Sequence, residues 1–493
     1  MAEPTVPEHV DVLVVGAGIS GIDAAYHLQT ECPGHTYAIL EGRHALGGTW
    51  DLFRYPGIRS DSDMYTLGFP FHPWTGEKSI ADGASILAYL HETAEAYGID
   101  CKIRYDHQVV RAEWSTATST WTVDVLAGPD ATPTTLTCGF LYACSGYYSY
   151  EGGYQPAFPG TEQYEGEIVH PQAWPEDLDV TGRRIVVIGS GATAVTLVPT
   201  LAATAEHVTM LQRSPSYIAS LPARDPFADL VRKHLPARVA HGLVKWKNVL
   251  LTSAFYQLSR RRPKLVRKVL HTRIAALLPE GFALDPHFTP SYDPWDQRLC
   301  LVPDGDLFRA LEAGTASIET GLIETFTDDG IRLTDGTELV ADLVVSATGL
   351  NLVGAGGIDL VVDDEPVELA QTYTYKGHML SGVPNFAMCL GYTNASWTLR
   401  ADLTSRAVCR LLNHLRATGD TKAVPTVDPD TIEPRPLLDL DSGYVRRAAD
   451  RLPKQGSKAP WNLRQNYVLD LLSTRFGAVE ESMDLSRPAS SPR

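Results

Sequence analysis

The sequence of 493 residues lacks paired cysteines, an excess of basic residues and long hydrophobic runs, and each absence excludes a class of protein. Its seven cysteines are scattered and form no C-x-x-C pair, so neither a disulfide framework nor a thiolate zinc site is expected, and a reducing cytoplasm is the expected location. The formal net charge of −17 argues against nucleic acid as a partner. No apolar run reaches the ~20 residues of a membrane-spanning helix, and the N-terminus does not have the pattern of a signal peptide.

Two stretches each have the pattern of a strand, a glycine-rich turn, a helix and a second strand. Residues 10–41 contain the apolar run "VDVLVV", the turn "GAGISG" and the strand "TYAIL", which leads to Glu41. Residues 183–213 repeat this plan with "RRIVVI", "GSGATA" and "HVTMLQ", and end at Arg213. Such βαβ units bind the pyrophosphate of a dinucleotide at the N-terminus of the helix. The sequence therefore predicts an α/β protein with two dinucleotide-binding domains.

The first unit has the pattern expected for FAD or NAD. Gly16 permits a tight turn, Gly18 lets the backbone approach a pyrophosphate, and Gly21 lets the helix pack closely on the strand. Glu41 follows about 20 residues later, where a carboxylate accepts hydrogen bonds from the two ribose hydroxyls and repels a 2′-phosphate.

The second unit differs from the first at the position that contacts the ribose. Gly189, Gly191 and Ala194 form the related pattern G-x-G-x-x-A, but no acidic residue ends the second strand. Arg213 stands there, and a guanidinium pairs with a 2′-phosphate through charge-assisted hydrogen bonds. This unit is predicted to bind NADP. One flavin and one NADPH define a flavin-dependent oxidoreductase.

Two short apolar strands that end in small residues are predicted to be the crossings between the domains. The strand in "FLYACSGYY" stops at Gly146, and the strand in "ADLVVSATGLN" stops at Gly349. The predicted fold is therefore α/β, with two Rossmann-like domains and the NADPH domain inserted in the FAD domain. The predicted divisions are an FAD-binding domain over residues 1–145 and 348–480, the second part including a C-terminal wrap; an NADPH-binding domain over 146–347 with a helical subdomain at about 222–295; and a disordered tail over 481–493.

Reduced flavin can pass electrons to a disulfide, to a protein acceptor or to oxygen. A disulfide reductase with two dinucleotide sites needs a cysteine pair beside the flavin, close to the first βαβ unit or in the NADPH domain. The stretch "EGRHALGGTWDLFRYPGIRSDSDMY" contains no cysteine, and the start of the second unit contains none either. The sequence therefore excludes a disulfide reductase of this type.

Several motifs resemble those of the class B flavoprotein monooxygenases. They are "GGTWDLFRYPG", "YEGEIVHPQAWP", "GSGATA", "QRSP" and "SATG", in this order and spacing. The second motif resembles the Baeyer–Villiger fingerprint F-x-G-x-x-x-H-x-x-x-W-P/D, with Tyr164 in place of the usual Phe. The motifs "DPWDQRLCLVP" and "GYTNASWTL" are similar to those of the ethionamide-activating branch. The resemblance extends from about residue 9 to residue 475.

The resemblance implies catalytic roles for four residues. Arg298 would stabilise anionic oxygen species, because a guanidinium does not lose its proton. Asp61 would hold Arg298 in place, and its alternative role is to cap the helix that begins at "SDMYTL". His170 and Trp174 would lie on the linker into the NADPH domain, which in the family moves as the cofactor changes role. The alternative for His170 is a packing histidine beside a buried tryptophan.

The glycine motifs and the resemblance together imply the cofactor ligands. For FAD they are Gly16, Gly18, Ser20, Gly21, Glu41, Gly48, Thr49, Trp50, Asp61 and the backbone near Val109. For NADP they are Gly189, Ser190, Gly191, Ala192, Thr193, Ala194, Arg213 and Ser214. Many related enzymes have Lys where Gln297 precedes Arg298, so selectivity for NADPH is expected to depend mainly on Arg213 and Ser214. No metal is expected.

The implied activity is the oxygenation of a ketone to an ester or lactone through a C4a-peroxyflavin. The same intermediate would also serve S- or N-oxygenation of thioamides, sulfides or amines, and the sequence does not separate these reactions. An uncoupled NADPH oxidase and a non-enzymatic nucleotide sensor are further alternatives, which Arg298 and the ordered motifs disfavour. The expected partners are O₂ and a small ketone or sulfur compound, and the expected state is a monomer or weak oligomer.

The segment 225–280 interrupts the α/β pattern and is predicted to be helical and basic. It has no acidic residue between Arg232 and Arg273. Basic amphipathic helices bind anionic membrane surfaces, so weak peripheral membrane contact is one hypothesis. The alternative is a solvated helical subdomain beside the substrate entrance.

Overall fold

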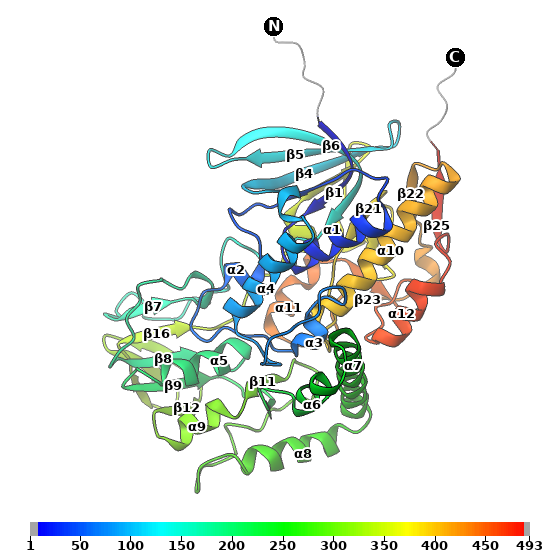
Figure 1. Ribbon diagram of the computed structural model, residues 1–493. Helices are drawn as coiled ribbons and strands as arrows, with labels where there is room; N and C mark the ends of the chain where they lie inside the picture. The colour runs from blue at the N-terminus through cyan, green and yellow to red at the C-terminus, as the bar shows by residue number, and fades with distance from the viewer. Residues whose placement is uncertain (1–7, 488–493) are drawn as a thin grey trace, which may run out of the picture.

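The computed structural model describes residues 8–487 and shows two α/β regions, one above the other in Figure 1. The upper region contains a nine-stranded sheet, and the lower region contains a five-stranded sheet with the strand order β12-β9-β8-β16-β7. The chain enters the lower region after β6 (Thr132–Ala143) and leaves it after β16 (Leu343–Ser346). The predicted α/β class, with one Rossmann-like unit inserted in the other, is therefore confirmed, and the boundaries at residues 145 and 347 stay predictions.

The core of the upper sheet is the predicted βαβ unit. β1 (Glu8–Val15) lies in parallel between β2 (Tyr37–Leu40) and β6, and α1 (Ile19–Glu31) connects β1 to β2. Both faces of this sheet are covered, so the consecutive residues Val12, Leu13 and Val14 are fully buried. This explains why the strand is a continuous apolar run and not an alternating one. The other elements before the first crossing are α2 (Thr49–Leu52), α3 (Met64–Leu67), α4 (Gly83–Ala96) and β3 (Ile103–Arg104).

An antiparallel extension, which the sequence did not predict, doubles the width of the upper sheet. β4 (His107–Ser115), β5 (Thr120–Ala127) and the first half of β6 pair antiparallel, whereas the second half of β6 pairs in parallel with β21 (Phe386–Met388). Trp114 and Trp121 stand opposite each other on β4 and β5, with ring centroids 5.6 Å apart, and fill the core below. β17 (Asp359–Val362) and β18 (Glu365–Pro366) complete the edge.

The lower sheet is the second βαβ unit with three further strands. β8 (Arg184–Ile188) and β9 (His207–Gln212) flank α5 (Ala192–Leu201) in sequence and pair in parallel. β7 (Glu167–Val169), β16 and β12 (Ala316–Thr320) extend the sheet on either side, all in parallel. The remaining elements of this region are β10 (Ile218–Leu221), β11 (Cys300–Pro303), α9 (Asp306–Glu312), β13 (Ile323–Thr327), β14 (Gly330–Leu333) and β15 (Glu338–Val340).

The predicted helical insertion consists of three helices at the bottom of Figure 1, at the end of the molecule farthest from the termini. They are α6 (Pro226–His234), α7 (Ala237–Arg261) and α8 (Pro263–Ala275). Asp225 accepts hydrogen bonds from the backbone of Phe227 and Ala228 and caps α6, and Pro263 starts α8 directly after α7. α7 also contacts α3 of the upper region, so the insertion lies across both regions.

After the second crossing the chain returns to the upper region. α10 (Trp397–Thr418) packs along α1, and α12 (Tyr467–Phe476) packs on α10. β25 (Met483–Ser486) pairs with β22 (Lys422–Pro425), so the prediction of disorder from residue 481 is wrong for this segment; residues 488–493 lie outside the described residues. The backbone hydrogen bonds of this two-stranded sheet hold the segment. The other elements are β19 (Thr374–Tyr375), β20 (Met379–Leu380), β23 (Pro434–Pro436), α11 (Gly443–Ala448) and β24 (Lys454–Gly456).

Within residues 8–487, every helix is too short or too polar to cross a lipid bilayer.

Candidate functional site

The first glycine-rich turn packs so closely that it has no room for side chains at two of its glycines. Gly16 has φ +102°, and a Cβ there would lie 2.8 Å from the carbonyl oxygen of Cys144. At Gly21 a Cβ would lie 1.9 Å from the carbonyl oxygen of Gly16, so α1 packs directly against the turn. Gly18 caps α1 without a side-chain hydrogen bond. The first N–H groups of α1 therefore point to a place without a protein side chain, as an anion-binding helix terminus requires.

Glu41 is held in place by two backbone amides. Its Oε2 accepts a hydrogen bond from the N–H of Ala17 at 2.7 Å, and its Oε1 accepts one from the N–H of Arg43 at 2.9 Å. Burial raises the pKa of the Glu41 carboxyl, and the two amides oppose this shift. Each oxygen keeps a further lone pair, so the arrangement fits the predicted role of accepting ribose hydroxyls.

A further glycine, Gly48, bounds the same site opposite Gly18. Gly48 has φ +55° and caps α2, and a Cβ on it would lie 3.1 Å from the Cα of Gly18. Thr49 begins α2 and is exposed, while Trp50 packs against the core of the upper region. The site is thus bounded by the starts of two helices, α1 and α2, which approach each other at glycine.

Two further predicted FAD ligands contact the protein itself. Ser20, on α1, accepts a hydrogen bond from Nε1 of Trp397 at 2.7 Å. Val109 is buried in β4, where the pairing with β5 shifts register between Val109 and Arg111. The N–H of His107, at the start of β4, donates to the carbonyl of Glu41 at 2.8 Å, so this strand begins beside the residue predicted to bind the ribose.

The second glycine-rich turn repeats the geometry of the first in the lower sheet. Gly189 has φ +142°, and a Cβ there would lie 2.5 Å from the carbonyl oxygen of Ala347. Gly191 caps α5 without a side-chain bond, and a Cβ on it would meet no atom of the described residues within 4 Å. Ala194 is fully buried, whereas Ala192 is exposed at the first turn of α5. The N-terminus of α5 is therefore open to a ligand.

The residues after β9 are the ones predicted to contact a 2′-phosphate. Arg213 and Ser214 are both exposed beside the turn. Ser190 donates its hydroxyl to the carbonyl oxygen of Ser214 at 2.8 Å, which fixes the distance between the turn and this segment. The backbone beside Arg213 is thus held close to the start of α5, and the exposed guanidinium of Arg213 is accessible to an anion.

His170 connects the two crossings of the chain. Its Nδ1 accepts a hydrogen bond from the N–H of Gln172 at 3.1 Å, and its Nε2 lies 3.2 Å from the carbonyl oxygen of Gly349. The nitrogen Nε2 is therefore the one that carries the proton. Gln172 in turn donates to the carbonyl of Ser149 at 2.7 Å, in the first crossing. Burial lowers the pKa of His170 despite the bond to Gly349, so the imidazole is neutral.

Trp174 packs as a half-buried side chain against the core of the lower region, as does Tyr55 from the upper region. Neither His170 nor Trp174, both among the described residues, lines the cavity that contains Arg298. The structure therefore separates the four predicted catalytic residues into two groups.

Arg298 and Asp61 form an ion pair between the two regions. Nη2 of Arg298 lies 3.0 Å from Oδ2 of Asp61, across 237 positions of sequence that only the fold brings together. The carboxylate of Asp61 raises the pKa of Arg298 above its usual range, although burial opposes the shift. Asp61 is not the helix cap: Asp63 accepts the hydrogen bond from the N–H of Thr66 at the start of α3, so the alternative role predicted for Asp61 is wrong.

A tight turn presents Arg298. Trp295 has φ +73°, a left-handed conformation that reverses the chain just before Arg298. Asp296 in the same turn pairs with Arg260 of α7 at 2.7 Å, and Asp293 pairs with Arg267 of α8 at 2.7 Å. The turn is thus held by one ion pair to each of the two long helices.

A cavity of about 930 Å³ contains this ion pair. Asp61 and Arg298 line it on one side, and apolar side chains of α7 and α8 form much of its wall, among them Phe255, Val266 and Leu270. An ion pair in a largely apolar cavity interacts more strongly than it would in water. The cavity is large enough for a substrate of moderate size.

Sequence analysis missed an aromatic cluster beside Arg298. The rings of Tyr147 and Tyr148 lie 4.6 Å apart, and Tyr147 also lies 5.1 Å from Trp397. Burial raises the pKa of Tyr147 to about 12, so its hydroxyl stays protonated near neutral pH. The tyrosines stand in "SGYYSY", shortly after β6, and Trp397 stands in "GYTNASWTL", which follows β21.

The chain is similar to known proteins over nearly its full length. The sequence profile of flavin-binding monooxygenase-like proteins matches residues 66–269, and that of the NAD(P)-binding Rossmann-like domain matches residues 14–77. The FAD-containing monooxygenase EthA of Mycolicibacterium smegmatis is 54% identical over 475 residues, covering 96% of this chain and 96% of that protein. EthA of Mycobacterium tuberculosis is 55% identical over 476 residues, covering 96% of this chain and 97% of that protein.

Solved structures show the same fold. An oxidized steroid monooxygenase bound to NADP aligns with a TM-score of 0.74 and 21% identity, covering 97% of this chain and 100% of that one. A complex of OTEMO with FAD and NADP aligns with a TM-score of 0.75 and 20% identity, covering 98% and 100%.

A Rossmann-like unit with a buried carboxylate after its second strand, interrupted by a second unit with an exposed arginine near the same place, defines the class of two-dinucleotide flavoproteins. Within this class the chain belongs to the family of FAD-containing monooxygenases that includes EthA. The resemblance to class B flavoprotein monooxygenases that the motifs predicted is thereby confirmed.

Proposed function

We propose that this protein uses NADPH and O₂ to insert one oxygen atom beside the carbonyl of a ketone, giving an ester or lactone. The observation that carries the proposal is the ion pair of Arg298 and Asp61 in the wall of the large cavity. A permanent cation in a largely apolar cavity is what an oxygenation through anionic intermediates requires.

The two nucleotide sites fit the two cofactors of the family. FAD would be held by the turn at Gly16 and Gly18, by the opposed Gly48 and by the carboxylate of Glu41. NADPH would be held at the start of α5, where Arg213 would pair with its 2′-phosphate. When bound, the flavin accepts a hydride from NADPH and transfers the electrons to O₂.

Arg298 has the role of stabilising negative charge on oxygen. The neighbouring carboxylate of Asp61 raises its pKa further, so the guanidinium is a cation at every working pH. Asp61 occupies one Nη atom, and the other N–H groups of the planar fork remain to donate to an anionic substrate oxygen. Asp61 is thus a positioning residue, since it fixes the guanidinium relative to the upper region.

His170 has a positioning role in the crossings. A neutral imidazole that donates to Gly349 and accepts from Gln172 connects both chain segments between the regions. Any rotation of the lower region relative to the upper one must pass through these two segments. We infer that His170 and Trp174 control this rotation and do not touch the reacting atoms.

A second candidate function is the oxygenation of sulfur in thioamides or sulfides. The branch motifs "DPWDQRLCLVP" and "GYTNASWTL", together with 54% identity to an EthA, favour this candidate. The same cavity and cofactor sites serve both reactions, but attack on sulfur needs no cation for an anionic adduct. Loss of Arg298 would therefore reduce ketone oxygenation more than sulfur oxygenation.

The test is to supply the purified flavoprotein with NADPH, ¹⁸O₂ and a mixed panel of ketones and thioethers, and to weigh the products while hydrogen peroxide is assayed. The proposal predicts esters that carry one labelled oxygen. Label confined to sulfoxides would contradict it and favour the second candidate. Hydrogen peroxide without any labelled product, across ketones of increasing size, would show an uncoupled NADPH oxidase.

A further inference from the structure

The solvent side of α7 and α8 is apolar where a soluble surface is normally polar. Val239, Leu243, Trp246 and Leu250 recur at intervals of four, three and four residues and form one stripe along α7. Their exposed fractions run from 41% for Trp246 to 57% for Leu250. The opposite side of the same helix buries Ala240, Val244 and Val249. One side of α7 is therefore covered by the protein, with His241 and Lys245 also among its buried residues, whereas the apolar stripe is left exposed by the described residues.

The stripe continues onto α8 around the mouth of the large cavity. Leu251 and Leu258 of α7, and Leu265, Val269 and Leu277 in and after α8, line the cavity and are also exposed. A residue that lines the cavity and is also exposed to solvent lies at the opening of the cavity. We call the stripe and this rim together the α7–α8 face. The opening of the cavity that contains Arg298 is thus surrounded by exposed apolar side chains.

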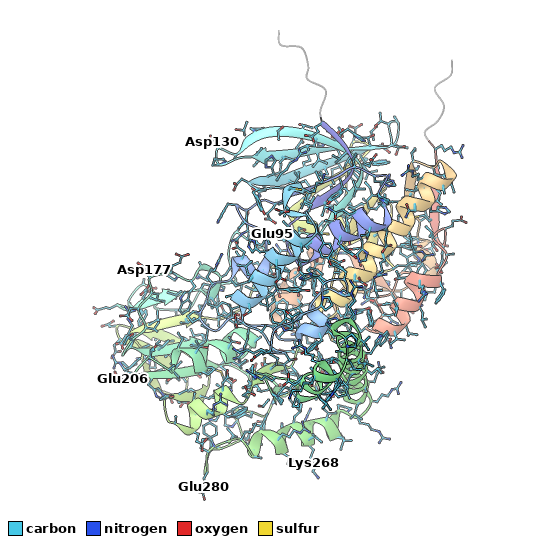
Figure 2. The ribbon with its side chains drawn as sticks, in the orientation of Figure 1. Glu95, Asp130, Asp177, Glu206, Lys268 and Glu280 are labelled. Atoms are coloured by element: carbon cyan, nitrogen blue, oxygen red, sulfur yellow. The ribbon has the colours of Figure 1, made fainter. Side chains whose placement is uncertain are left out.

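Positive charge surrounds the α7–α8 face. The exposed basic residues of this segment that form no ion pair within residues 8–487 are Lys233, Arg238, Arg261, Arg262, Lys264, Lys268 and Arg273. Figure 2 shows Lys268 pointing away from the body of the molecule at its lower end. No acidic residue occurs between Arg232 and Arg273, although the whole chain has a net charge of −17. The cations are therefore concentrated here against the overall charge.

We propose that the α7–α8 face binds the surface of a bilayer that contains anionic lipid, so that the cavity opens into the membrane. The apolar stripe and the rim would enter the boundary between head groups and acyl chains, and the surrounding cations would contact lipid phosphates and carboxylates. A second copy of the same face is a poor occupant, because it would bring two groups of unpaired cations together. This proposal goes beyond the proposed function and does not depend on it.

The face also explains an otherwise unfavourable cavity opening. Exposed Leu251 and Leu265 at the rim would be in contact with water in a free protein. In the bound state they would contact acyl chains, and an apolar substrate dissolved in the bilayer would reach the cavity without crossing water.

The experiment is flotation of the FAD-loaded protein with vesicles of phosphatidylcholine alone or mixed with phosphatidylglycerol, at low and at high salt. We expect binding to the mixed vesicles, and binding that falls with salt and is weak with phosphatidylcholine alone. The triple variant Arg261→Gln, Lys264→Gln, Lys268→Gln should bind roughly 100-fold more weakly, since each basic residue near an anionic surface contributes roughly fivefold. Leu243→Ser with Leu250→Ser should also weaken binding, with less effect on the salt dependence.

The matched control is Leu322→Ser with Val340→Ser, which changes two equally exposed apolar residues far from these helices in sequence and should leave binding unchanged. Flavin content and the thermal transition of each variant show that it is folded. A spectroscopic check is quenching of Trp246 by brominated lipid, taken as the difference from Trp246→Phe. Absence of binding to mixed vesicles at low salt, equal binding by all variants, or a dimer that the Leu243 and Leu250 changes dissociate would each overturn the proposal.

Discussion

The two nucleotide units of this protein share one plan of strand, glycine-rich turn and helix, and they differ in the buried side chain at the end of the second strand. In each, the first glycine donates its N–H to the carbonyl at the end of the second strand: Gly16 to Leu40 at 2.7 Å, and Gly189 to Leu211 at 2.8 Å. The next residue is Glu41 in one unit and Gln212 in the other, and both are 2% exposed.

The difference lies in the direction of the hydrogen bonds. Glu41 accepts bonds from the turn, whereas the amide of Gln212 donates to the carbonyl of His287 at 2.8 Å and to Thr320 Oγ1 at 3.0 Å, away from the turn. In the proposed cofactor sites, the carboxylate held towards the turn would face a ribose diol, and the amide held away from the turn would leave that place to the neighbouring Arg213. We therefore expect ribose selectivity to depend on what the buried side chain bonds to, as well as on its charge.

The largest effect on stability is expected at the contact between the helix and the glycine-rich turn, which is closer in the first unit than in the second. Gly21→Ala should destabilise the protein by about 3 kcal/mol, because the new Cβ would lie 1.9 Å from the carbonyl oxygen of Gly16 and α1 would have to move. The corresponding change in the second unit, Ala194→Gly, only removes a buried methyl and should cost about 1 kcal/mol. Urea unfolding of both variants measures the difference. Equal losses would show that the two helices pack alike.

The second-largest effect is expected on the affinity for FAD when the buried carboxylate of Glu41 is exchanged for an amide. Glu41→Gln removes one of the two acceptors for the N–H groups of Ala17 and Arg43 and the charge near the ribose, so FAD should bind about 100-fold more weakly. Equilibrium dialysis of the apoprotein with FAD measures this. The converse change, Gln212→Glu, places a carboxylate against the carbonyl of His287 and should leave FAD affinity unchanged. A loss of FAD affinity in that control would contradict the assignment of the two units.

Arg213→Ala should raise the KM for NADPH by about 30-fold and hardly change the KM for NADH, because a charge-assisted contact to the 2′-phosphate is lost. Steady-state consumption of each cofactor measures this. The neighbouring Ser214→Ala is the milder companion change, expected to act in the same direction by a few-fold. If both cofactors are affected equally by Arg213→Ala, the phosphate lies elsewhere.

A smaller effect is expected in the pH dependence of stability, because the helices α1 and α5 of the two units differ in a buried histidine. α1 buries His27 between Asp23, Asp402 and Glu31, whereas α5 has Thr196 and Thr200 at the corresponding positions. Burial lowers the pKa of His27, but the neighbouring carboxylates outweigh burial and raise this pKa to about 10. The unfolded value is about 6.5, so this stabilisation is complete below about pH 6.5 and is lost as pH rises towards 10.

Unfolding free energies from pH 7 to pH 10 test that expectation. The protein should lose at least about 1 kcal/mol more over this range than the His27→Gln variant does, because the variant has no proton to lose. Thr200→Val on α5 should leave the pH dependence unchanged. A parallel pH dependence in wild type and His27→Gln would show that His27 is neutral in the folded protein.

The sequence predicted the features of the molecule that depend on local pattern. Both βαβ units follow from a strand, a glycine turn and a helix in succession, and Gly146 and Gly349 mark the crossings because buried strands must end where the chain turns. The antiparallel β4–β5 extension was missed, because β6 reads as one strand although its halves pair with different partners in opposite directions. The order of β25 depends on pairing with β22, about 60 residues earlier in the chain, which no local signal indicates.

In the candidate site, too, the features that depend on local spacing were predicted from the residues themselves, whereas those that depend on distant contacts were not. The glycine turns, Glu41 and Arg213 were predicted from spacing, and the pairing of Arg298 with Asp61 was expected from family resemblance alone and is present at 3.0 Å. The cap of α3 was misplaced by two residues, because Asp61 and Asp63 are both plausible caps and the ion pair decides between them. The exposed apolar rim was not predicted, since only the fold shows which side of α7 is uncovered.

The role of Arg298 can be tested by comparing Arg298→Ala with the unchanged protein in NADPH oxidation, ester formation and hydrogen peroxide release. We expect that the variant is still reduced by NADPH at a nearly normal rate, forms at least about 100-fold less ester, and releases hydrogen peroxide in its place. Ester formation at the normal rate, with no additional peroxide, would contradict the role of Arg298 and with it the proposed function of the cavity.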